Sequence, residues 1–328
     1  MTNTRPATIL ESTMKLSSEQ LRHFDEEGYV IAQQALRDSD LGPVIDDIGA
    51  FVDRRAGELY SEGLISNLHK HGSFEQRLAL ITRENTAIYD GMDIMHFRGE
   101  AMFRFLCNDK LMDVVENLVG PEITCSPIQH LRAKLPNDLI QFERGDHDQL
   151  ASRVNENVAP WHQDAQVHLE EADPSFILTV WIPLCDTDER NGCLQIVPRI
   201  HKEQVVYWSE GFGIADEAIN EEDILSIPMK KGDVLLMHKL IPHRSIKNQT
   251  NTIRWSMDLR YQRTGTPTGR SFYPDFITRS RTHPEFVFTD HESWSHCWEE
   301  AVKATATNKR PGRENRPTEP TPMKVVVN

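Results

Sequence analysis

The chain has 328 residues, 38% hydrophobic and 26% charged, which is enough for one large domain or two small ones with a substantial core. Its net charge of −14 argues against binding a nucleic-acid backbone or docking on an anionic membrane, because both need a basic surface. No run of about 18 apolar residues is present, and residues 1–15 lack the basic start and apolar centre of a secretory signal, so we expect neither a membrane span nor export.

The first 120 residues have mainly helical patterns. Ser17 to Gln20 match a capping box, and the helix that it opens is predicted to stop at Gly28. Residues 29–32 then read as a short strand. Apolar residues at helical spacing predict two further helices, at residues 40–60 and 108–120.

After residue 121 the pattern changes to short β-prone runs separated by turn residues. These runs are residues 123–134, 176–184, 193–197, 224–227, 234–238 and 253–261. Asn191-Gly192, between the second and third runs, is a strong signal for a two-residue hairpin. Many short strands without intervening helices predict an antiparallel sandwich or barrel.

We expect a single folded domain at residues 16–303, between a flexible N-terminus at 1–15 and a disordered, proline-rich tail at 304–328. Its predicted parts are a helical layer at 16–120, a β-barrel core at 121–262 and a C-terminal elaboration at 263–303. The acidic segment 209–223 fits either a solvated loop or an active-site lid.

The five cysteines are widely spaced, and no two of them form a C-x-x-C pair. An odd number of cysteines without such pairs disfavours both a disulfide framework and a zinc ribbon. We therefore expect reduced thiols and a cytoplasmic location.

A candidate metal site begins with His162-Gln163-Asp164 in strand-like sequence. Residues i and i+2 of a strand point to the same face, so His162 and Asp164 would present an imidazole and a carboxylate side by side. Two histidines and one carboxylate are the ligands of a non-haem Fe(II) oxygenase. His238 and His243 are both candidates for the third ligand. The alternative is that these are ordinary histidines in a chain that has fourteen.

The segment 253–262 alternates strictly between apolar and polar residues. The polar positions are Arg254, Ser256, Asp258, Arg260 and Gln262. That face would meet solvent in an open antiparallel sheet, or a ligand cavity in a barrel covered by helices. In the second case Arg254 would be a buried guanidinium, whose planar fork suits a carboxylate.

Together these motifs resemble the phytanoyl-CoA dioxygenase family of Fe(II)/2-oxoglutarate oxygenases. The resemblance is carried by Trp161 to Asp164, by residues 191–198, and by His243 with Ser245 two residues later and Arg254 eleven residues later. The opening at residues 16–30 is also similar, so the resemblance covers about residues 16–262. Arg199-Ile200 departs from the small pair that the family commonly has.

The resemblance implies a mainly β fold with helices, namely a double-stranded β-helix (a jelly-roll, cupin-like barrel) flanked by N-terminal helices. It implies Fe(II) on His162, Asp164 and His243, with 2-oxoglutarate and O2 as co-substrates. His243 is favoured over His238 because only His243 has Ser245 and Arg254 at the matching offsets. Further contacts with 2-oxoglutarate are implied for Arg254, Ser245, Lys134, Trp181, Thr179 and Gln129.

The implied reaction is hydroxylation of an unactivated C–H bond in a small-molecule metabolite, with release of succinate and CO2. Desaturation, cyclisation or epimerisation would use the same residues, whereas halogenation is disfavoured because Asp164 is present. Two alternatives of other classes are a zinc hydrolase with the same three ligands and a non-catalytic jelly-roll binding protein.

The substrate itself is not specified by these motifs. The acidic net charge favours a polar or cationic small molecule over a polyanion. Candidate substrate contacts are His168, Arg270, Phe272, Tyr273 and Asp275.

Overall fold

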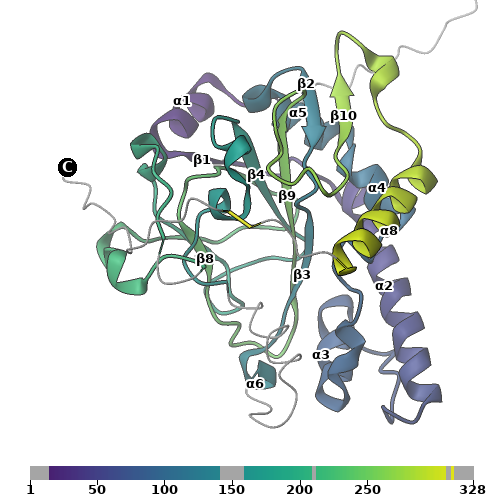
Figure 1. The fold of residues 1–328 in the computed structure, drawn as a ribbon. Helices are drawn as coiled ribbons and strands as arrows, with labels where there is room; N and C mark the ends of the chain where they lie inside the picture. The colour runs from purple at the N-terminus through teal and green to yellow at the C-terminus, as the bar shows by residue number, and fades with distance from the viewer. Residues whose placement is uncertain (1–14, 141–158, 209–211, 308–311, 314–328) are drawn as a thin grey trace, which may run out of the picture.

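The computed structural model describes residues 15–140, 159–208, 212–307 and 312–313, and it combines two antiparallel sheets with a layer of helices (Figure 1). The helices are α1 (Ser18–Glu27), α2 (Asp38–Ser61), α3 (Phe74–Glu84), α4 (Glu100–Leu106), α5 (Asp109–Val119), α6 (Asn137–Ile140) and α8 (His291–Thr307). The strands are β1 (Tyr29–Ala32), β2 (Glu122–Cys125), β3 (His130–Lys134), β4 (Ile177–Pro183), β5 (Leu194–Ile196), β6 (Leu225–Ile227), β7 (Val234–His238), β8 (His243–Ser245), β9 (Arg254–Arg263) and β10 (Phe276–Ser280).

The large sheet has the order β1-β7-β4-β9-β2-β10, with β3 also paired to β9, and the small sheet has the order β6-β5-β8. All the strand pairs within these sheets are antiparallel, as the short β-prone runs predict. The large sheet reaches beyond the expected core at 121–262, because β1 pairs with β7 and β10 pairs with β2. Both edge strands come from sequence that lies far from their partners.

The predicted helix starts and stops are confirmed at both ends of the helical layer. Ser17 caps α1 in a complete capping box, and Gly28 ends it at φ +82°, a left-handed conformation that glycine adopts without strain. The side chain of Asn108 accepts the backbone N–H groups of Lys110 and Leu111 at the start of α5.

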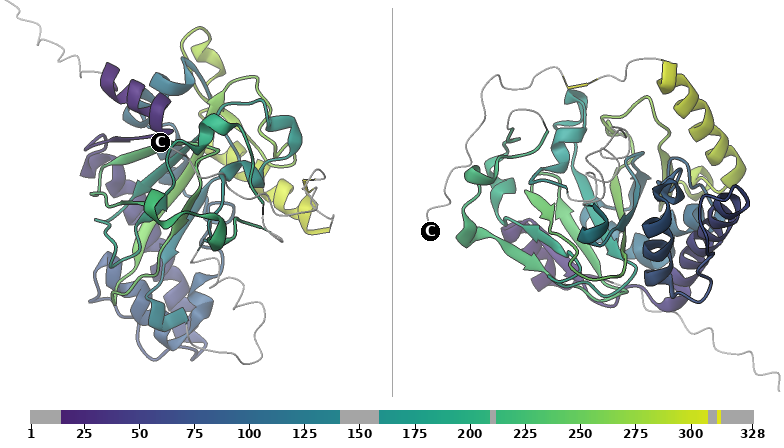
Figure 2. Two further views of the ribbon diagram at one scale, coloured as in Figure 1. Left: turned by 90° about the vertical axis from the view of Figure 1, so that its left-hand side faces the viewer. Right: turned by 90° about the horizontal axis from the view of Figure 1, so that it is seen from below.

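Helices cover one face of the large sheet, and the second view of Figure 2 shows them gathered on one side of the strands. The apolar positions of β9, among them Trp255, Met257 and Leu259, belong to the buried cluster that the helices share. The polar positions therefore point the other way, toward the small sheet. All of these positions except the half-buried Asp258 are buried, with Arg254 4% and Arg260 5% exposed, so the interpretation in which this face meets solvent is wrong.

The Asn191-Gly192 hairpin prediction is also wrong, because β4 and β5 lie in different sheets. Residues 184–193 form a longer connection in which the Asn191 side chain accepts the N–H of Asp188 and donates to the carbonyl of Asp186. A two-residue turn needs strands that abut it, and here polar residues separate the turn from β4. The expected run at 123–134 is likewise broken into β2 and β3 around Ser126-Pro127, since proline has no N–H for the ladder.

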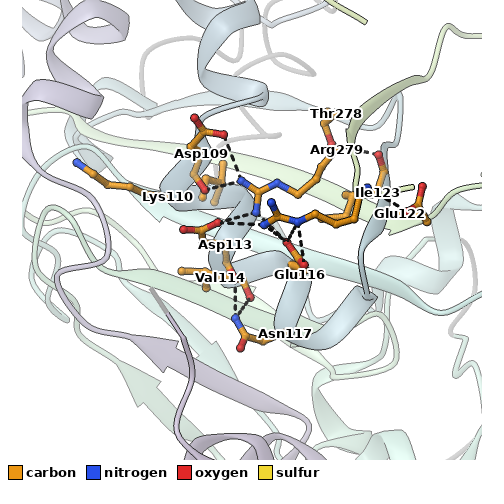
Figure 3. A network of polar contacts seen from close by, with 12 residues as sticks. Asp109, Lys110, Asp113, Val114, Glu116, Asn117, Glu122, Ile123, Thr278 and Arg279 are labelled. Carbon is orange, nitrogen blue, oxygen red and sulfur yellow. Dashed lines mark hydrogen bonds and ion pairs between the residues drawn. The ribbon is translucent and has the colours of Figure 1, made fainter. Parts of the chain in front are cut away.

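The C-terminal region is more ordered than the sequence suggests. β10 is fixed to α5 by Arg279, whose Nη1 lies 2.6 Å from Asp113 and 2.9 Å from Glu116 (Figure 3). The tail was expected from residue 304, but α8 continues to Thr307. Arg313 then donates to the carbonyls of Ala165 and His168, and most of the other tail residues lie outside the described part of the chain.

Within the described ranges, no helix combines the length and the apolar character needed to span a bilayer.

Candidate active site

Three side chains able to ligate a metal converge between the two sheets: His162, Asp164 and His243. Their ligand atoms all lie within 4.8 Å of one another. The Oδ1 atom of Asp164 is 4.0 Å from Nε2 of His162 and 3.9 Å from Nε2 of His243. The structure thus brings His243 to the H-x-D motif, and His238 lies elsewhere, with its ring 5.4 Å from that of His201.

The backbone sets the spacing of the two histidine rings. His162 and His243 form an isolated antiparallel bridge and exchange both N–H···O bonds, at 3.0 and 2.9 Å. Asp164 is not on a continuing strand as expected, because it begins a short 3-10 helix, Asp164–Val167. The tighter turn, and not strand alternation, brings its carboxylate to the two imidazoles.

Both imidazoles are held in the form that a metal needs. Nδ1 of His162 is 2.8 Å from the carbonyl of Pro160, and Nδ1 of His243 is 3.0 Å from the carbonyl of Ile241. A carbonyl only accepts, so each Nδ1 carries a hydrogen and Nε2 is the ring nitrogen left to face a metal. Burial, followed by the neighbouring His243, lowers the pKa of His162 to about 3, which keeps that ring neutral.

Asp164 is almost fully buried, and two side chains of the large sheet hold its carboxylate. Arg260 donates from Nη2 to Oδ1 at 2.6 Å and from Nε to Oδ2 at 3.2 Å, and Thr179 donates to Oδ2. Burial alone would raise the pKa of Asp164, but the charge and the hydrogen bonds of Arg260 hold it well below its usual range. The carboxylate is therefore ionised and available as a metal ligand.

A second group of buried side chains is basic. Lys134 and Arg254 are direct partners across β3 and β9, so both side chains point to the same face. Nζ of Lys134 donates to Oγ of Ser245 at 2.9 Å, and the guanidinium of Arg254 lies 5.3 Å from the ring centroid of Trp181. Nε of Arg254 is buried and has no hydrogen-bond partner in the described structure.

The polar groups of this arrangement would be better satisfied with a carboxylate bound than they are in the protein alone. Burial, and then the charge of Arg254, lower the pKa of Lys134 to about 6. Gly192 leaves room for the lysine, because a Cβ there would lie 2.4 Å from Cε of Lys134. An anion between the two cations would satisfy Arg254 and favour the charged form of Lys134.

Two other predicted co-substrate contacts are placed differently. Gln129 donates to Sγ of Cys125 and to the carbonyl of Ser126. Since Cys125 is paired with Tyr261, on the helix-covered face of the sheet, the amide of Gln129 points away from the metal ligands. Thr179 lies on the inner face, but its hydroxyl bonds Asp164.

Of the predicted substrate contacts, His168 and Arg270 lie around the loop that follows Asp164, whereas Phe272 and Tyr273 pack with the helix-covered cluster. Nδ1 of His168 bonds the carbonyl of Thr268, and Arg270 donates to the carbonyl of Val167. Tyr273 packs against Trp298 of α8, at 5.2 Å between ring centroids. Asp275 has its pKa raised by burial.

Two neighbours of the metal ligands were not anticipated. Arg260 was placed on the polar face of its strand, but no sequence signal separated it from the other polar positions. Phe212, which is 48% exposed, lies 5.4 Å from the His162 ring at the edge of the site. It comes directly after residues 209–211, which lie outside the described part of the chain, in the segment that fits a loop or a lid.

The comparisons with known proteins agree with this site. The family model for phytanoyl-CoA dioxygenase matches residues 24–256. Peroxisomal phytanoyl-CoA dioxygenase of Rattus norvegicus is 25% identical over 256 residues, covering 75% of this chain and 68% of that protein. 1-Deoxypentalenic acid 11-beta-hydroxylase of Streptomyces exfoliatus is 35% identical over 121 residues, covering 32% of this chain and 41% of that protein.

A solved structure extends the likeness to the fold. The non-heme monooxygenase ThoJ in its apo form superimposes with a TM-score of 0.56 at 17% identity, covering 88% of this chain and 99% of ThoJ. The match to the family model spans well over half of the chain and includes all three candidate metal ligands. The chain therefore belongs to the phytanoyl-CoA dioxygenase family, and it is a 2-oxoglutarate-dependent non-haem iron dioxygenase.

Proposed function

We propose that the protein hydroxylates an unactivated C–H bond of a small molecule and that its strands form the double-stranded β-helix of this enzyme class. The balanced reaction joins the substrate, O2 and 2-oxoglutarate to give the alcohol, succinate and CO2. The observation that carries the proposal is the complete His162, Asp164 and His243 set beside the buried basic side chains of Lys134 and Arg254. When bound, Fe(II) and 2-oxoglutarate together supply the oxidising chemistry.

The residues divide into those that hold the metal and those that hold the co-substrate. His162, Asp164 and His243 would ligate Fe(II) through two neutral imidazoles and one carboxylate. Arg254, Lys134 and Ser245 would bind the distal carboxylate of 2-oxoglutarate, with Trp181 beside the guanidinium.

Apolar side chains on the inner faces help to exclude water from the reacting atoms. Trp181, Leu235 and Met237 of the large sheet pack with Leu194 and Ile196 of the small sheet. A dry site protects a reactive intermediate from side reactions.

Hydroxylation is favoured over halogenation because Asp164 is present and ionised, so a halide would have to displace a charged ligand. A zinc hydrolase could use the same three ligands but would have no need of the cations Lys134 and Arg254. Desaturation, cyclisation and epimerisation differ from hydroxylation in how the substrate is placed, so product analysis distinguishes them.

The proposal is tested with anaerobically purified protein. Addition of Fe(II) and 2-oxoglutarate should produce the weak visible charge-transfer band of their chelate, and admission of O2 should release succinate. A screen of polar and cationic small molecules should find compounds that raise the rate of succinate release and gain one oxygen atom. Absence of the band and of succinate, with Zn(II) bound and a hydrolytic product formed, would point to the zinc alternative.

Binding of 2-oxoglutarate should weaken as the pH rises from 6 to 8. The depressed pKa of Lys134, about 6 in the free protein, makes this side chain neutral at pH 8, and it must take up a proton to pair with the co-substrate. The dissociation constant should rise by up to about tenfold per pH unit, as expected when binding is linked to one proton. Calorimetry with saturating Fe(II), in buffers of different ionisation enthalpy, measures both the affinity and the proton uptake.

Lys134→Met is the control for this pH dependence, since it removes the titrating group and keeps the apolar stem. Its affinity should be lower at pH 6 and should change little with pH. His162, with its pKa of about 3, does not titrate in this range. An unchanged slope in Lys134→Met would assign the dependence to another group.

A further inference from the structure

Arg260 and Thr179 meet at Asp164 because of the register of the large sheet. They are direct partners across β4 and β9, so their side chains leave the same face side by side. Thr179 is 3% exposed, and the side chains of Arg260 and Asp164 are 6% and 1% exposed. Two buried donors of the large sheet thus hold the carboxylate of a metal ligand.

The donors fill the acceptor positions of the carboxylate unequally. An ionised carboxylate has about four lone-pair positions, two on each oxygen. Among the described residues, Oδ2 receives the hydroxyl of Thr179 and Nε of Arg260, whereas Oδ1 receives only Nη2 of Arg260. One acceptor position therefore remains, and it is on Oδ1, the oxygen within 4.0 Å of Nε2 of both histidines.

We propose that Arg260 and Thr179 are positioning residues that make Asp164 a ligand through Oδ1 alone. The planar guanidinium fork fixes the rotation of the carboxylate, and the threonine hydroxyl occupies the oxygen that would otherwise allow two-oxygen coordination. Outer hydrogen bonds of this kind orient metal ligands and tune the metal. The inference rests on the proposed function, because it requires a metal at the triad.

The test is a titration with Co(II), whose visible spectrum reports the number and arrangement of its ligands. Arg260→Gln should lower the Co(II) affinity by about 10- to 100-fold, the usual effect of losing an outer-shell partner. Arg260→Lys should lie between this variant and the wild type, because lysine can replace one hydrogen bond but not the fork. Thr179→Val should bind Co(II) with a changed spectrum, since Oδ2 becomes free to coordinate, and Thr179→Ser should restore the wild-type spectrum.

Arg279→Gln is the matched control. It also removes a guanidinium that pairs with carboxylates and whose side chain is 9% exposed (Figure 3). Arg279, however, lies on β10, an edge strand of the large sheet. This replacement should lower the melting temperature and leave Co(II) affinity and spectrum unchanged. If Arg279→Gln loses as much Co(II) affinity as Arg260→Gln does, then Arg260 contributes only to general stability and does not position Asp164.

The outcomes separate this inference from the proposed function. Wild-type protein that binds no Co(II), or binds it equally well as His243→Ala, contradicts the metal centre itself. If the wild type binds and His243→Ala does not, then a folded Arg260→Gln with wild-type affinity and spectrum overturns the inference. Should Arg260→Gln fail to fold, the spectra of Thr179→Val and Thr179→Ser decide, and identical spectra in both overturn it.

Discussion

We expect the replacement of His243 by alanine to abolish metal binding and succinate formation, and this is the largest effect that we predict. The side chain supplies one of the three metal ligands found in the described part of the chain, and its Nδ1–H is already committed to the carbonyl of Ile241. Removing a ligand should cost more than the 10- to 100-fold in affinity that loss of an outer-shell partner costs, so we expect a reduction of more than about 100-fold. Anaerobic Fe(II) titration and succinate release measure the two effects.

His238→Ala is the matched control, because sequence alone left both histidines open as the third ligand. His238 ends β7, where its Nδ1 accepts the N–H of Leu240 and its ring packs 5.6 Å from Phe176. Its loss should lower the melting temperature and leave Fe(II) affinity within about twofold of the wild type, as expected for a site without shared partners. Loss of Fe(II) binding in His238→Ala, with retention in His243→Ala, would reverse the assignment of the third ligand.

The sequence predicts best those features that depend on periodicity or on a family motif. The alternation at 253–262 predicts both faces of β9, and only the surrounding helices decide that its polar face points inward. The spacing of Ser245 and Arg254 after His243 selects this histidine before any geometry is known. Local signals at Ser17 and Gly28 likewise place the ends of α1.

Features that depend on distant partners could not be predicted in this way. Arg260 bonds a residue 96 positions away in sequence, and nothing local distinguishes it from Ser256 or Gln262. Asn191-Gly192 looks like a hairpin, but the strands on either side join different sheets, which only the complete topology decides. Arg313 lies in a segment of disordered composition, yet it bonds the loop next to Asp164.

The two sheets contribute different parts of the site. His243 and Ser245 come from β8 of the small sheet, whereas Arg254 and Arg260 come from β9 of the large sheet. The separation between the sheets therefore sets the distance between the metal ligands and the groups that orient them. Apolar packing between the sheets stabilises this distance, so substitutions at Trp181 or Met237 should affect the metal and the co-substrate together.

Arg254→Met should weaken binding of 2-oxoglutarate by about 30-fold to several thousand-fold. The guanidinium is buried and its Nε has no partner in the described structure, so a carboxylate bound there would lose a buried charged partner. Truncating one member of a buried charge pair costs about 2–5 kcal/mol, which corresponds to that range of dissociation constants. Anaerobic titration with Fe(II) present measures it through the charge-transfer band, and Arg254→Lys should recover only part of the affinity.

Arg244→Met is the matched control for Arg254→Met. Arg244 also lies over a tryptophan, 4.7 Å from the ring centroid of Trp161, but it bonds Gln195 on the opposite side of β8. Its replacement should leave 2-oxoglutarate affinity unchanged.

Arg254→Met should also raise the pKa of Lys134, because one of the two causes that depress it is the charge of Arg254. The fall in affinity between pH 6 and 8 should therefore begin at a higher pH in this variant. If Arg254→Met binds 2-oxoglutarate as tightly as Arg244→Met does, with the same pH dependence, the co-substrate lies elsewhere.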